Sequence, residues 1–242
     1  MKNIFSVMFA VFFLFSANAY SSDKTRQYRE QEDKALSEIT IGSHITFGNY
    51  PFEADGRKKP IEWIVLEKYD DETVLMITRY AVDKAKFHKK QKPVKWKGST
   101  IRSWLNGKFL NTAFSKKERR VIRTVSNVND DNKKYKTRGS WNTSDKVFLL
   151  SIDEAKKFFD SDGSRRAYPT PYTTRDTIYS GTSWQWLRSP GSEPDSSAII
   201  SDMGDVDDIG YFVSHTGNVR PVIRTRIRYL LRIKIRDEQR KK

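Results

Sequence analysis

The sequence predicts an α+β domain in which antiparallel strands are joined by turns and short helices. Ile61–Leu66 and Thr73–Thr78 are apolar runs separated by the polar segment Asp70–Glu72, a pattern typical of a β-hairpin. Ser115 and Ser151 are each followed three residues later by a glutamate, the capping-box pattern that opens a helix. The last third of the chain alternates short apolar runs with glycines, which favours a closing meander.

The remaining elements follow from apolar spacing and turn residues. We expect a helix that begins at Ser99 or Thr100, because apolar residues recur at helical spacing in the residues that follow. Gly107 divides this helix. We expect loops over residues 84–97, 127–142 and 164–183. We expect strands over residues 42–50, 146–150, 184–189, 198–200, 211–213 and 219–227, with turns near Gly204, Gly210 and Gly217.

The N-terminus predicts export. Lys2 precedes the apolar run Ile4–Phe15, and Ala17-Asn18-Ala19 matches the small-x-small pattern that signal peptidase cleaves. We therefore expect a secreted or periplasmic bacterial protein with no transmembrane segment in the mature chain; an uncleaved anchor is the alternative. The expected divisions are a signal peptide at 1–19, a polar leader at 20–38, one α+β domain at 39–227 and a basic tail at 228–242, either helical or a strand extension.

Composition narrows the class of protein. The chain has no cysteine, which excludes a thiol nucleophile, an acylated lipoprotein and cysteine-ligated metals. Its formal net charge is +15, with the excess clustered in Lys84–Lys97, Lys116–Arg123 and Arg224–Lys242. Such a surface attracts anionic lipid or acidic polysaccharide, whereas export argues against nucleic acid. The alternative is a solvated basic face without a particular partner.

Several phrases in order resemble one family. The resemblance covers residues 41–227 and points to the bacterial domain of unknown function numbered 6273, seen in secreted and surface proteins. The phrases are Phe47–Tyr50, Pro60–Leu66, Ile101–Asn106, Phe109–Asn111, Val147–Ser151, Trp186–Gly191 and Val219–Pro221.

The ending of the chain is more distantly similar to C-type-lectin-like and sulfatase-modifying-factor-like domains. That similarity implies a twisted antiparallel sheet, flanking short helices and long ligand-facing loops. The sulfatase-modifying activity is not carried over, because it depends on cysteine. The iron-dependent relatives need a His-x-x-x-His pair, whereas His44, His88 and His215 are scattered singly.

Two acidic segments are candidates for calcium. Glu193-Pro194-Asp195 is similar to the acid-Pro-acid triplet of calcium-dependent lectins, although its Trp-Asn partner phrase precedes it at Trp141-Asn142. Asp202, Asp205, Asp207 and Asp208 also lie close together, without EF-hand spacing. Ordinary polar turns explain both segments, so no cofactor is expected beyond calcium as an open alternative.

The binding residues are sought among aromatic and arginine side chains of the last third. Aromatic rings on loops stack on sugar faces or grip peptides while few torsions are ordered. The candidates are Trp184, Trp186, Tyr172, Tyr179 and Tyr211. Arg188 and Arg220 recur in the family phrases; each either binds a carboxylate or ties loops together through backbone carbonyls. Buried tryptophans of the core are the alternative for Trp184 and Trp186.

The sequence favours a non-catalytic binding module for an extracellular glycan or protein. It contains no nucleophile elbow, no phosphate-binding glycine loop and no paired histidines. Two further hypotheses stay open: an envelope protein whose basic tail docks on anionic lipid or polysaccharide, and a hydrolase of unrecognised type. Glu62, beside Trp63 in an apolar strand, is the one acid whose setting suggests a raised pKa; a place on the polar face of the sheet is the favoured alternative.

Overall fold

A computed structural model describes residues 26–27, 29–176 and 181–232. The contacts divide the chain into a large unit, Ile41–Leu230, and a small one, Met1–Thr40 with Leu231–Lys242. In the small unit, residues 29–38 are helical, and Glu32 accepts two hydrogen bonds from Nε of Arg232. The expected signal peptide, Tyr179 and the end of the basic tail lie outside the described residues. None of the described helices is long and apolar enough to span a membrane.

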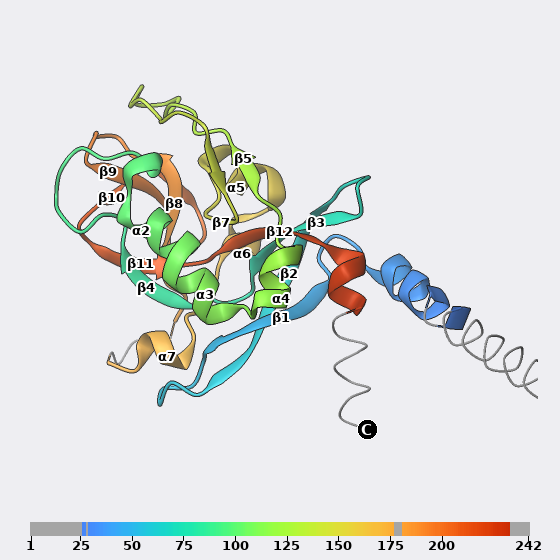
Figure 1. The fold of residues 1–242 in the computed structure, drawn as a ribbon. Helices are drawn as coiled ribbons and strands as arrows, with labels where there is room; N and C mark the ends of the chain where they lie inside the picture. Colours follow the sequence, from blue (N-terminus) through green and yellow to red (C-terminus); the bar gives the residue numbers. More distant parts are fainter. Residues whose placement is uncertain (1–25, 28, 177–180, 233–242) are drawn as a thin grey trace, which may run out of the picture. The chain divides into compact units, whose positions relative to one another are not determined.

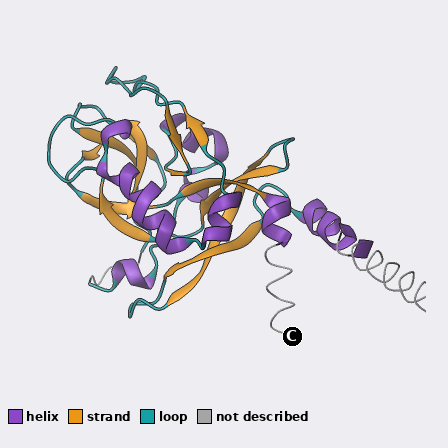
Figure 2. Cartoon of the chain, in the orientation of Figure 1, coloured by secondary structure: helices purple, strands orange, loops and turns teal. Residues whose placement is uncertain are grey.

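The large unit is a mixed α+β domain, as the sequence predicts. In its described part the strands form two sheets of five and one ribbon of two, with short helices between them (Figures 1 and 2). The first sheet has the order β1 (His44–Pro51), β2 (Lys58–Lys68), β3 (Thr73–Thr78), β12 (Val222–Arg226), β7 (Val147–Phe148). The second sheet has the order β10 (Val206–Phe212), β9 (Ser196–Ile200), β8 (Gln185–Pro190), β11 (Thr216–Val219), β4 (Asp83–Lys86).

The expected hairpin forms the centre of the first sheet. β2 and β3 are antiparallel, with Trp63 opposite Thr78 and Ile64 opposite Ile77. All six residues of β3 are buried, so both faces of this strand are covered, and β2 and β12 pair with its two edges. Trp63 is fully buried, and its indole Nε1 donates to the carbonyl of Phe47 over 2.8 Å. This sheet therefore supplies much of the core.

The second sheet corrects the expectation of a loop over residues 84–97. Residues Asp83–Lys86 form β4, an edge strand that pairs antiparallel with β11, with Gly217 opposite Ala85. A sheet partner far along the chain overrides the low strand propensity of lysine here. β11 also contacts β8 in parallel, at Asn218 and Gln185.

The helices lie mainly between Ser99 and Arg175. The expected helix begins with Ser99 as its cap, and Gly107 lies in a π-helical turn, Leu105–Phe109, between α2 (Thr100–Trp104) and α3 (Leu110–Ala113). Figure 1 shows these helices in one row with α4 (Lys116–Val121). Both capping boxes form, at the starts of α4 and α5 (Ile152–Phe158).

The loop expected over residues 127–142 is confirmed apart from Asn127, and it connects the two strands of the ribbon, β5 (Val125–Asn127) and β6 (Thr143–Asp145). The loop expected over residues 164–183 contains regular structure. The irregular stretch after residue 160 includes α6 (Asp162–Arg165) and α7 (Pro171–Thr174). Residues 227–232 are helical, which selects the helix over the strand extension for the start of the tail.

The chain passes between the two five-stranded sheets several times, and two of these crossings contact each other. One leaves β11 after Val219 and enters β12 at Val222, and an earlier one runs from β3 to β4. Arg220 lies at the later crossing, and its Nε donates to the carbonyl of Thr78 at the earlier one over 2.6 Å. The amide of Thr78 in turn donates to the carbonyl of Pro221. The two crossings are thus bound to each other.

Candidate functional site

The second sheet brings several aromatic side chains together. The ring centroids of Trp184 and Tyr211 lie 4.8 Å apart, and Trp186 packs edge-on against Trp184 at 4.8 Å. His215, in the turn between β10 and β11, contacts the rings of Tyr211 and Phe212 at 5.9 and 6.0 Å. We call Trp184, Trp186, Tyr211, Phe212 and His215 the aromatic cluster.

Burial in the aromatic cluster decreases from Trp186 outwards. Trp186 is buried, and its Nε1 donates to the carbonyl of Ala85 over 2.9 Å. Trp184 is half-buried, whereas Tyr211 is 43% and Phe212 52% exposed. Part of the cluster is therefore core, and its outer part is a surface of exposed rings in which Tyr211 is backed by Trp184.

A glycine makes room for the inner rings. A Cβ atom at Gly217 would lie 2.2 Å from the six-membered ring of Trp184 and 2.7 Å from Nε1 of Trp186. The turn expected near Gly217 lies at residues 213–215, and Gly217 itself is inside β11, where the close packing of the rings needs a glycine. Gly210 likewise lies within β10, at an irregularity in its pairing with β9 and with a φ of 71°.

Tyr172 lies away from these residues, on α7. Its amide donates to the carbonyl of Phe52, and the guanidinium of Arg175 stacks over its ring at 4.3 Å. Phe52 in turn packs edge-on against Tyr80, with ring centroids 5.6 Å apart. The structure therefore separates Tyr172 from the other candidate aromatic residues, and Tyr179 falls outside the described part of the chain.

Arg188 is buried and bound mainly by the fold. Its two terminal nitrogens form an ion pair with both carboxylate oxygens of Glu154 and also donate to the carbonyls of Leu149 and Val128. Arg188 therefore ties β8 to α5 and to the end of the ribbon. Its Nε alone has no hydrogen-bond partner.

Arg220 is also buried, and its known contacts are backbone carbonyls and one ring. It donates to the carbonyls of Thr78 and Arg165, and its guanidinium stacks over Phe159 at 5.5 Å. Burial lowers the pKa of Arg220 to about 10, because the charged form loses solvent. The contacts match the loop-tying alternative for both arginines.

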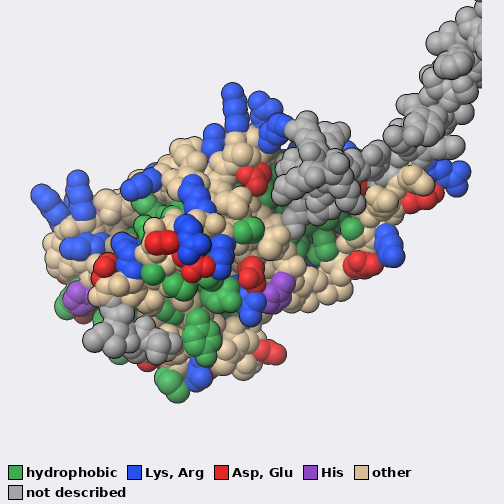
Figure 3. Space-filling view, turned by 90° about the horizontal axis from the view of Figure 1, so that it is seen from below, with side chains coloured by type: hydrophobic (Ala, Val, Ile, Leu, Met, Phe, Trp, Pro, Cys, Tyr) green, Lys and Arg blue, Asp and Glu red, His purple; other side chains and the backbone are tan. Residues whose placement is uncertain are grey.

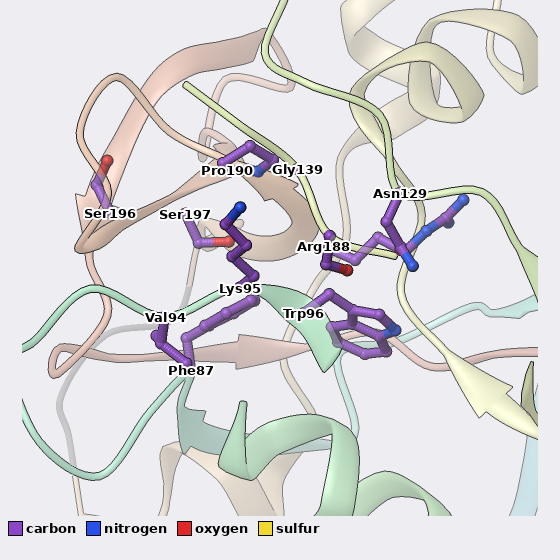
Figure 4. A pocket seen from close by; sticks show the side chains of 11 residues that line it. Phe87, Val94, Lys95, Trp96, Asn129, Gly139, Arg188, Pro190, Ser196 and Ser197 are labelled. Carbon is purple, nitrogen blue, oxygen red and sulfur yellow. The ribbon is translucent and has the colours of Figure 1, made fainter. Parts of the chain in front are cut away.

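A narrow cleft lies beside Arg188 (Figure 4). Its volume is only about 10 Å³, close to the space that one water molecule needs. Val94 and Lys95 border it on one side, Asn129 comes from the ribbon, and Arg188 and Ser197 come from the second sheet. In Figure 4 the side chain of Lys95 rises through the middle of this space toward Ser197. We call it the Arg188 cleft.

The acidic triplet Glu193–Asp195 accepts hydrogen bonds from the lysine-rich segment, residues 84–97. The carbonyl of Pro194 accepts from the amide of Val94, and the carboxylate of Asp195 accepts from Nε2 of Gln91 over 2.7 Å. The carbonyl of Asp195 also accepts from the amide of Val213. In the described residues no three His, Asp or Glu side chains are close enough together to hold a metal ion.

Two other acids bear on the question of catalysis. Glu62 forms an ion pair with Arg79 over 2.8 Å at the surface of β2. Asp83 is the described carboxyl whose pKa burial raises, and it accepts a 2.6 Å hydrogen bond from the hydroxyl of Tyr50. The same burial, with Asp83 beside it, raises the pKa of Tyr50. The pair links β1 to β4.

Sequence reasoning missed several residues that surround these sites. At Phe212 and His215 the sequence pattern indicates only the end of a strand and a turn, and nothing in it indicates a binding role. Asn129 and Lys95 lay in segments expected to be loops, although both line the Arg188 cleft. One signal was available: Trp96, a large apolar residue amid lysines, is fully buried and donates from Nε1 to Asp145.

Comparison with known proteins identifies the family and nothing more specific. No curated protein and no solved structure matches the chain, so the comparisons give no support to a lectin-like similarity. The matching family model covers residues 71–227, well over half of the 242 residues. The matched region includes the aromatic cluster, the Arg188 cleft and both buried arginines. The chain therefore belongs to the family described as Domain of unknown function (DUF6273).

Proposed function

We propose that this protein is a non-catalytic binding module that acts outside the cytoplasm and holds an extracellular glycan against the aromatic cluster. The observation that carries the proposal is the exposure of Tyr211, whose ring is backed by Trp184, next to the exposed ring of Phe212. Aromatic faces stack on the C–H faces of sugars, and a ring that is already fixed loses little entropy on binding. A lectin-like fold is part of this proposal.

The ring of Tyr211 is held in place by packed side chains, which favours a binding role over an apolar patch without a function. Trp184 rests on Gly217 and against Trp186, so Tyr211 has a packed ring behind it. Ile209 on the same strand is also exposed, which extends the apolar surface along β10. Exposed apolar surface of this kind marks interaction sites in soluble proteins.

The test is a glycan and cell-wall array probed with the domain lacking residues 1–19, with and without calcium. Tyr211→Ala and Phe212→Ala are each expected to weaken binding at least about tenfold, the loss typical of a central aromatic contact. Tyr229→Ala is the matched control, because Tyr229 is 48% exposed but lies beyond β12. No glycan binding by the parent domain, or an equal loss with Tyr229→Ala, would refute the proposal.

A second candidate, docking on an anionic surface, is favoured by the lysine-rich segment. Lys89, Lys90, Lys92, Lys95 and Lys97 are all exposed. Figure 3 also shows Lys and Arg side chains standing out at several places on the face that it draws. Near the C-terminus, Asp71 pairs with Arg224 of β12 and Glu72 pairs with Arg228, the first arginine of the tail.

Vesicles containing anionic lipid test this second candidate. Exchanging Lys89, Lys90 and Lys92 for glutamine is expected to weaken binding and to flatten its dependence on salt. Deletion of residues 233–242 gives the matched comparison for the tail. Binding that is unchanged in both variants would remove this candidate.

A further inference from the structure

Trp141 is the most exposed of the large apolar side chains in the described residues, at 82%. All six tryptophans of the chain lie in the described residues, and the other five are buried or half-buried. An indole in water leaves a large apolar surface uncovered, which is unfavourable. Its N–H nevertheless suits polar surroundings, so a tryptophan fits a boundary between water and an apolar phase.

The backbone that carries Trp141 is held by hydrogen bonds. Its carbonyl accepts from Nδ2 of Asn129 over 3.0 Å and from Oγ of Ser140 over 3.1 Å. The amide of Ser140 donates to the carbonyl of Asn129, and a Cβ at Gly139 would lie 2.1 Å from that carbonyl oxygen. The two sides of the ribbon are therefore closed tightly against each other here, and little backbone entropy is lost when Trp141 binds a partner.

The rest of the loop between β5 and β6, residues 128–142, is tied to the second sheet. Oγ1 of Thr137 donates to the carbonyl of Ser192 over 2.7 Å. Nδ2 of Asn132 donates to three carbonyls, which belong to Pro190, Gly191 and Asp208. Figure 1 shows this loop extending away from the rest of the domain. The loop is thus both prominent and fixed, as a docking element needs to be.

The charges around Trp141 are mostly positive. Within residues 128–142 four cations and two carboxylates are exposed: Lys133, Lys134, Lys136, Arg138, Asp130 and Asp131. The lysine-rich segment adds five exposed lysines between residues 89 and 97, with no acid among them. Lys133 pairs with Asp153 over 2.6 Å, but the excess of cations over acids in the two segments remains large. Such a surface is complementary to a dense array of negative charge.

The lysine-rich segment lies beside the strand that follows Trp141. Nε1 of Trp96 donates to the carboxylate of Asp145 in β6 over 3.1 Å, which fixes the end of the segment to the ribbon. Lys95 lines the same narrow cleft as Ser140, the residue before Trp141. The exposed indole and the last lysines of the segment are therefore neighbours, and one flat partner can contact both.

We propose that Trp141 and the cations beside it dock on a bilayer that contains anionic phospholipid, with the indole inserted among the headgroups. This inference rests on the second candidate of the proposed function, docking on an anionic surface, and names its partner and its apolar anchor. The lysines attract the charged leaflet over about a Debye length. The indole then adds an apolar contact that salt does not screen.

A second apolar side chain favours a bilayer over an acidic polysaccharide. Val128 is 52% exposed, and Val128 and Trp141 lie on the strand side of the hydrogen-bonded pair Asn129 and Ser140. An aromatic ring can stack on a sugar face, whereas an aliphatic side chain has no such partner on a highly charged polysaccharide. Both side chains gain free energy when they leave water for a bilayer interface.

The experiment measures binding of the chain without residues 1–19 to vesicles of phosphatidylglycerol and phosphatidylcholine, to vesicles of phosphatidylcholine alone, and to soluble alginate. We expect binding to the anionic vesicles only. Trp141→Ala should weaken it at least about tenfold, the value of a well-buried apolar side chain. Lys95→Gln and Lys97→Gln should each weaken it about fivefold at low salt. Tyr168→Ala is the matched control, because Tyr168 is 58% exposed and lies outside the loop and the lysine-rich segment.

A fluorescence readout is independent of affinity. Phospholipid brominated on its acyl chains quenches an indole that enters the bilayer, and Trp141 is the tryptophan most open to such contact. We expect quenching in the parent protein bound to anionic vesicles and its loss in Trp141→Phe, a variant that keeps an aromatic ring and still binds. Quenching that persists in Trp141→Phe would show that another tryptophan enters the bilayer and would overturn the assignment.

The outcomes separate this inference from the candidate function on which it rests. If the lysine variants weaken binding to anionic vesicles but Trp141→Ala does not, or if Tyr168→Ala costs as much, docking stands and the anchor fails. Tighter binding to alginate than to the anionic vesicles would keep the anionic surface and overturn the bilayer as its partner. If the parent protein binds neither, the docking candidate itself fails, and this inference fails with it.

Discussion

The two five-stranded sheets have different surroundings. In the first sheet β3 is buried along its whole length, between β2 and β12. In the second sheet the end strand β10 is half-buried to exposed along its length and carries Ile209, Tyr211 and Phe212 at the surface. The second sheet also has a buried interior, because every residue of β9 is buried, and only its edge at β10 keeps large apolar side chains at the surface. The contrast is therefore between a buried central strand and an exposed edge strand.

The largest expected loss of stability comes from a substitution in the core of the first sheet. Trp63→Ala removes a fully buried indole that stacks near Phe114 and donates to Phe47, so the free energy of unfolding should fall by about 3–5 kcal/mol. Phe212→Ala, in the exposed part of the second sheet, should change it by no more than about 0.5 kcal/mol. Urea titration of both variants measures the difference. Similar losses would contradict the contrast between buried and exposed strands.

The next effect concerns two glutamates in the same local motif. Glu118 and Glu154 both close capping boxes, but only Glu154 also pairs with the buried Arg188. Glu154→Gln leaves that guanidinium without its counter-charge and should cost about 3 kcal/mol, the lower end for a broken buried pair, since Glu154 is partly exposed. Glu118→Gln should cost a few tenths of a kcal/mol. Equal unfolding midpoints for the two variants would show that Arg188 does not need Glu154.

A smaller effect is expected where the second sheet supports its aromatic surface. Gly217→Ala places a Cβ 2.2 Å from Trp184, which forces the ring or the strand to move and should cost about 1–3 kcal/mol. Because Trp184 and Trp186 are both displaced, near-ultraviolet circular dichroism should change as well. Gly107→Ala is the control, since nothing lies within 4 Å of a Cβ at that position. An unaltered spectrum in Gly217→Ala would contradict the proposed support.

The smallest effect is a dependence of stability on pH near the second sheet. Burial, with Lys92 and Lys89 nearby, lowers the pKa of His88 below its ordinary value of 6.5. The unfolded chain therefore binds a proton at higher pH than the folded chain, so the stability contributed by neutral His88 is present above pH 6.5 and is lost as pH falls below it. His88→Phe should reduce the slope of unfolding free energy against pH in that range. An identical slope in the variant would exclude His88 as its source.

The sequence predicted those elements whose patterns are local. The hairpin of β2 and β3, the cap at Ser99 and the capping boxes at Ser115 and Ser151 are confirmed, because each depends on residues a few positions apart. β4 was missed because its partner, β11, lies more than 120 residues further along the chain. No local pattern reports such a pairing.

The candidate site was predictable in its residue types and not in its assembly. Trp184 and Tyr211 were expected, and the structure places their rings in contact. That Arg188 would be enclosed by Glu154 and by carbonyls from two other segments could not be read from its own neighbourhood in the sequence. The cleft itself joins residues from the lysine-rich segment, the ribbon and the second sheet.

The pairing of β2 with β3 has a practical consequence for anyone who shortens this chain. The family match begins at residue 71, after β1 and β2 have ended. A fragment starting there would lose the neighbour of β3 along one whole side and uncover a strand whose six residues are all buried. Open apolar edges of this kind attract other chains and lead to aggregation. A piece that keeps β3 covered on both sides therefore starts near residue 41, thirty residues before the family match begins.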